Sequence, residues 1–90
     1  MIVEEVARVL NYGDLKAKIE AARDLRRLVR KSSSANSKSA VRCRFAVAGV
    51  IEPLVLMLQS SFPLAAREAA LLALLNLAAG NQSTSSFLYV

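Results

Sequence analysis

Residues 49–79 constrain the fold more than any other stretch, because they are mostly apolar and far longer than a strand. Their first half is an apolar run interrupted by one glutamate and one proline, and their second half is rich in alanine and leucine. A short break between the halves supplies a serine as a helix cap and Pro63, which suits the first turn of a helix. The stretch therefore predicts two antiparallel helices, near 50–60 and 63–79, joined by a tight turn.

The first third of the chain carries a second pair of helical patterns. Apolar residues recur at three- and four-residue spacing near 2–11 and again near 15–31. Gly13 is placed to end the first of these helices, and Asp14 is placed to cap the second. We therefore expect another antiparallel helical hairpin, whose second helix is both amphipathic and strongly basic.

A serine-rich segment, 32–39, separates the two hairpins and is typical of an exposed, mobile loop. A short helix is expected after it, near 40–48, with Cys43 as a half-buried residue. Gly49 can take the left-handed conformation that ends such a helix.

The two hairpins repeat one another. The aligned pairs are Val3 with Ile51, Val6 with Leu54, Leu10 with Leu58, Leu15 with Leu64, Leu25 with Leu74 and Leu28 with Leu77. Such self-similarity indicates a tandem repeat, so the chain is interpreted as one region, 1–90, with repeat 1 at about 1–35 and repeat 2 at about 36–80. Residues 81–90 are polar and then hydrophobic, and we interpret them as the truncated or divergent start of a third repeat.

The central stretch also resembles a known family. The residues that carry the resemblance are Gly49, Val50, Ile51, Pro53, Leu54, Val55 and Leu58, followed by Glu68, Ala70, Ala73, Leu74, Asn76 and Leu77. In this order they resemble the second and third helices of an armadillo repeat, and they are most similar to plant armadillo proteins related to the U-box ubiquitin ligases. The resemblance implies an all-α, right-handed α-solenoid fragment of about two armadillo repeats. The U-box is missing, so ligase activity is not implied, and an unrelated helical hairpin rich in leucine and alanine is the alternative.

The residue types present argue against catalysis. The chain has no histidine, and its single cysteine has no partner for a disulfide or a Cys-His pair. The carboxylates are dispersed, and neither a glycine-rich phosphate loop nor a metal-ligand spacing occurs. We therefore expect a protein that is not an enzyme, with no catalytic residue, no metal site and no cofactor.

The apolar runs are too short or too interrupted to span a membrane. Charged residues at Glu4, Glu5 and Arg8 occupy the place where a signal peptide would be apolar. We therefore expect an intracellular protein, located in the cytoplasm, the nucleus or both.

The chain is unusually hydrophobic for its length, at 54% apolar residues and a mean hydropathy of +0.37. Five leucines lie within residues 71–77, more than one side of a helix can bury, and we expect Leu71 and Leu75 to be the exposed pair. Such a surface is typical of a site that a neighbour covers. Self-association through this C-terminal helix is therefore expected in addition to any other partner.

The family resemblance also implies a binding surface. In armadillo proteins an asparagine on the third helix hydrogen-bonds the backbone of an extended partner peptide, and here that residue is Asn76, with Leu72 one turn earlier. The aligned positions of repeat 1 are Arg27 and Arg23, and Arg30 continues the row. Guanidinium groups suit carboxylate or phosphate. The favoured interpretation is a protein-interaction module of the ubiquitin pathway or of a signalling scaffold, whose groove binds an acidic or phosphorylated extended segment.

A second class of function stays open, because every lysine and arginine except Arg67 lies in residues 1–48. The whole chain has a net charge of +5, and its basic half could bind nucleic acid or another anionic surface. Against it, aromatic residues are not interleaved with the basic ones, and no nucleic-acid motif matches. A further alternative is that the arginines form only the solvated face of an amphipathic helix.

Overall fold

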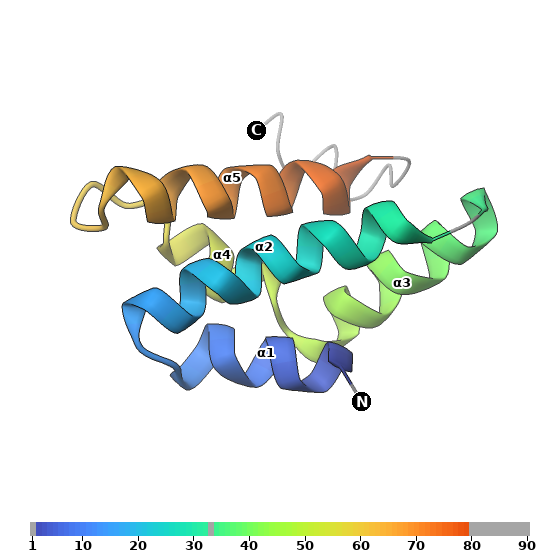
Figure 1. Ribbon diagram of the computed structural model, residues 1–90, viewed down its shortest axis with the longest axis horizontal. Coiled ribbons are helices and arrows are strands. Elements are labelled where there is room, and N and C mark those ends of the chain that lie inside the picture. Colours follow the sequence, from blue (N-terminus) through green and yellow to red (C-terminus); the bar gives the residue numbers. More distant parts are fainter. Residues whose placement is uncertain (1, 33, 80–90) are drawn as a thin grey trace.

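The computed structural model describes residues 2–32 and 34–79, and within these ranges the protein is all-α. The helices are α1 (Ile2–Tyr12), α2 (Leu15–Lys31), α3 (Ala35–Ala48), α4 (Ile51–Leu56) and α5 (Leu64–Ala78) (Figure 1). No strand occurs in the described part, which confirms the predicted fold class at this level. The expectations for residues 81–90 lie outside the described residues.

Local interactions explain several helix ends. The Asp14 carboxylate accepts a hydrogen bond of 2.8 Å from the Ala17 amide and so caps α2, as predicted. Gly49 has φ +86°, the left-handed conformation expected of it, and its amide donates to the Ala46 carbonyl at 3.1 Å. These two residues fix where α2 begins and where α3 ends.

The serine-rich segment was wrongly predicted to be a loop over its whole length. Helix α3 begins at Ala35, because the Ser34 hydroxyl accepts a hydrogen bond of 3.1 Å from the Ser37 amide and serves as the N-cap. The half-buried position predicted for Cys43 is also wrong, since this residue is exposed. Helix α3 instead buries Phe45, whose exposed fraction is 0%.

The connection between α4 and α5 is longer than predicted. Helix α4 ends at Leu56 rather than near residue 60, and turns follow it up to α5. The predicted serine cap is wrong too: Pro63 occupies the N-cap position, and its carbonyl accepts from the Ala66 and Arg67 amides at 3.0 and 3.1 Å.

Helices α2 and α5 lie side by side and run in the same direction (Figure 1). Their contact is the most extensive between any two helices of the described part. Helix α1 runs antiparallel to α2, α4 packs against α5, and α3 packs against α1 and α2.

One core receives residues from all five helices. Its large, fully buried side chains include Leu10, Leu25, Phe45, Leu54 and Leu74, one from each helix in chain order. Helix α5 contributes mostly alanines to this core, and their small size lets neighbouring helices approach closely.

Helix α5 is apolar on its outer side as well. Leu71 and Leu75 are 47% and 50% exposed, which confirms the pair expected from the sequence, and Leu64 and Leu72 are exposed too. Within the described ranges, no helix combines the length and the apolar character needed to cross a bilayer.

A candidate interaction groove between two parallel helices

A groove of about 450 Å³ lies between α2 and α5. Five basic side chains of α2 line one wall, and four residues of α5 line the other. The lining residues are Arg23, Arg26, Arg27, Arg30 and Lys31 from α2, and Ala65, Glu68, Ala69 and Leu72 from α5. We call this feature the arginine groove.

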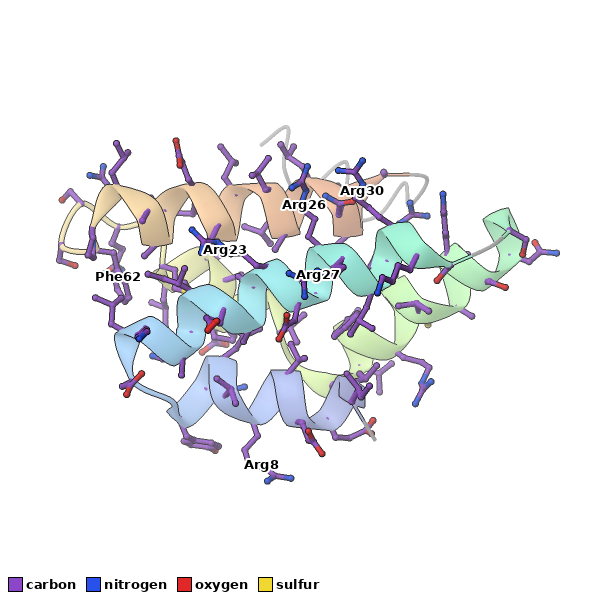
Figure 2. All side chains as sticks on the ribbon, viewed as in Figure 1. Arg8, Arg23, Arg26, Arg27, Arg30 and Phe62 are labelled. Atoms are coloured by element: carbon purple, nitrogen blue, oxygen red, sulfur yellow. The ribbon has the colours of Figure 1, made fainter. Side chains whose placement is uncertain are left out.

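The helical repeat explains why so many cations share one wall. Arg23, Arg26, Arg27 and Arg30 stand at positions i, i+3, i+4 and i+7, which lie on one face of a helix. Figure 2 shows Arg26 and Arg30 extending from α2 toward α5, whereas Arg8 of α1 points away from the groove. Opposite them, α5 presents the short side chains of two alanines, which leaves the space open.

The charges of the arginine groove are largely uncompensated. The Arg27 Nη1 atom lies 2.9 Å from the Asp24 Oδ1 atom, in an exposed pair between neighbouring turns of α2. In the described part of the chain, Arg23, Arg26, Arg30 and Lys31 have no ion pair. Glu68 is the one acidic residue that lines the groove, so the site carries a strong positive excess.

Arg26 differs from its neighbours. Its Nε atom is buried and has no hydrogen-bond partner among the described residues. A buried donor without a partner costs about 1–3 kcal/mol, so this side chain is held at an energetic expense. Arg26 thus gives the groove a partly desolvated cation rather than a fully solvated one.

Asn76 does not line the arginine groove. Its side-chain amide donates to the Leu72 carbonyl of its own helix at 2.9 Å. Its backbone carbonyl accepts a hydrogen bond of 2.8 Å from the Arg42 Nε atom of α3. The structure therefore brings Leu72 together with Arg23, Arg27 and Arg30, and places Asn76 at the C-terminal end of α5 beside α3.

The site residues expected from the sequence do not include Arg26, Lys31 or Glu68. The signal for Arg26 was available, because this residue stands three positions after Arg23 and four before Arg30. Alignment with Leu72 and Asn76 selects only Arg23 and Arg27, and helical spacing adds Arg30. The signal for Glu68 is of the same kind, because this residue stands four positions before Leu72 on the same helix.

No cluster of three or more histidine, cysteine, aspartate or glutamate side chains suitable for a metal ion occurs in the described ranges.

Comparison with protein-family models, with curated proteins and with solved structures gave no match to this chain. The fold and the site by themselves define an all-α protein with a basic interhelical groove. The relationship to armadillo repeats rests on the sequence resemblance and stays a proposal.

Proposed function

We propose that this chain is a non-catalytic protein-interaction module whose arginine groove binds an extended, acidic or phosphorylated segment of a partner protein. The observation that carries the proposal is a wall of four cations without an ion pair among the described residues. They are Arg23, Arg26, Arg30 and Lys31, and they face a wall of α5 that is apolar apart from Glu68. Guanidinium groups bind carboxylate and phosphate with paired hydrogen bonds, and their positive field also speeds the encounter with an acidic partner.

The dimensions of the groove support a short extended segment. Seven positions separate Arg23 from Arg30, and a helix rises 1.5 Å per residue, so the wall is about 10 Å long. An extended chain advances about 3.3 Å per residue, so about three residues lie along it. Leu72, 41% exposed, offers an apolar contact beside the cations.

The armadillo resemblance extends this proposal. If α1–α2 and α3–α5 are two solenoid repeats, their parallel long helices would form part of a concave binding face, and Asn76 would bind a partner backbone further along it. A role in the ubiquitin pathway or as a signalling scaffold in the cytoplasm or nucleus follows from the same resemblance. The exposed leucines of α5 would serve self-association or contact with a further repeat.

The test is fluorescence anisotropy with a short labelled peptide that contains glutamates and one leucine. Arg30→Glu should weaken binding by about tenfold or more, because it replaces a groove cation with a repelling charge. Lys16→Glu is the matched control: it makes the same charge change on α2 at an exposed site outside the groove, and should change affinity by no more than about twofold.

Equal losses in the two variants would mean that net charge alone drives binding, which contradicts a groove. A single-stranded oligonucleotide of random sequence tests the alternative function. Binding of the oligonucleotide that exceeds peptide binding and falls steeply with salt would favour a nucleic-acid binder instead.

A further inference from the structure

Most cations of the arginine groove have no acidic partner. Arg23, Arg26 and Arg30 lie within two turns of α2, with Lys31 adjoining them, and none of the four forms an ion pair with a described residue. Arg27, the position that aligns with Asn76, forms an ion pair of 2.9 Å with Asp24. The guanidinium groups of Arg23, Arg26 and Arg30 therefore carry most of the positive charge that no described carboxylate pairs with.

Glu68 on the opposite wall limits which anions can bind in the groove. A run of carboxylates along the groove would place one of them beside Glu68, where like charges repel. A single phosphate occupies one position along the wall, so the uncharged part of the peptide can lie beside Glu68 and its amides can donate to the Glu68 carboxylate. One doubly charged group therefore suits the two walls better than a run of singly charged carboxylates.

Partial burial of Arg26 also favours a ligand with one highly charged group. Its Nε atom is covered and unpartnered, so part of the guanidinium charge has lost its water. A phosphate monoester carries a charge of about −1.5 to −2 and three acceptor oxygens, whereas a carboxylate carries one charge and two oxygens. With three acceptor oxygens, a phosphate can accept hydrogen bonds from more than one guanidinium group at once.

Leu72, with Ala65 and Ala69, adds an apolar wall directly beside the cations. We infer that the groove is selective for a phosphoserine or phosphothreonine that has an apolar residue next to it or two positions away, in an extended segment. This inference rests on the proposed function and narrows its ligand to a phosphorylated peptide. Arg26 and Arg30, one helical turn apart and both directed toward α5 in Figure 2, bind the phosphate, and Leu72 contacts the apolar side chain.

The experiment compares three labelled peptides that differ at one position: phosphothreonine, glutamate or threonine, each followed by leucine. At pH 7.5 the phosphothreonine peptide should bind at least about tenfold more tightly than the glutamate peptide, and the threonine peptide should bind weakest. Arg26→Gln and, separately, Arg30→Gln should remove the preference for phosphate. Lys16→Gln is the matched control, because Lys16 is exposed on α2 outside the groove, and this variant should keep the preference. Circular dichroism checks that each variant is folded.

The pH dependence gives an independent readout. The second phosphate pKa is about 6, so lowering the pH from 7.5 to 5 makes the ligand a monoanion and should remove most of the preference over glutamate. The chain has no histidine, the side chain that ordinarily titrates in this range, and the charged groups facing the phosphate are the arginines, Lys31 and Glu68.

The outcomes distinguish phosphate selectivity from the proposed function on which it rests. Equal binding of the phosphothreonine and glutamate peptides would overturn phosphate selectivity and leave an acidic-peptide groove standing. Binding of neither peptide would overturn both. A preference for phosphate that survives Arg26→Gln and Arg30→Gln would also overturn the inference, because the phosphate would then lie outside the groove.

Discussion

Replacing Phe45 with alanine should destabilise the protein more than any other single truncation in α3. Phe45 is the buried hydrophobic anchor of this helix, with an exposed fraction of 0%, and it is among the largest fully buried side chains. Truncating a buried phenylalanine to alanine costs about 3–5 kcal/mol, through lost transfer free energy and the cavity left behind. At about 0.05–0.15 kcal/mol per residue, a domain of this length has a free energy of unfolding of about 5–13 kcal/mol.

The variant should therefore lose a large share of its stability, measured by urea unfolding followed by circular dichroism at 222 nm. Val47→Ala is the matched control, because Val47 lies on the same helix and is 83% exposed. This control should change the free energy of unfolding by less than about 0.5 kcal/mol. If Phe45→Ala costs less than about 1 kcal/mol, α3 does not dock on the common core and the packing described above is wrong.

Three further predictions follow from other contacts. Arg42→Ala should cost about 1 kcal/mol in urea unfolding, because it removes the 2.8 Å hydrogen bond to the Asn76 carbonyl at the end of α5. Gly49→Ala should lower the free energy of unfolding by about 1–2 kcal/mol, for conformational reasons alone, since φ is +86° and an added Cβ would meet nothing within 4 Å. Leu71→Glu combined with Leu75→Lys should reduce concentration-dependent association in sedimentation velocity; unchanged association would show that this face of α5 is not the self-association site.

The parts of the fold that could be predicted are those encoded by nearby residues. Asp14 and Gly49 act through amides within a few positions, so their roles are visible in the sequence. Apolar spacing placed α2 and α5 within one residue of their ends. The start of α3 could not be predicted in this way, because a serine suits both a loop and an N-cap, and here Ser34 is a cap.

The site was predictable only in part. The basic face of α2 follows from spacing, but which arginines face α5 depends on how the two helices are rotated against each other. The spacing of Arg26 from Arg23 and Arg30 indicates the shared helix face but not that this face is turned toward α5. Asn76, expected beside the arginines, lies off the groove. The Arg42 contact joins residues 34 positions apart, and no local pattern announces it.

The central claim is that one groove between α2 and α5 is the binding site. The most direct test is a titration of ¹⁵N-labelled protein with the phosphothreonine peptide, followed by amide chemical shifts. The account predicts shifts concentrated at residues 23–31 and 65–72. Shifts spread equally over the other basic positions, at 16–18 and 38–44, or absent from residues 65–72, would contradict it.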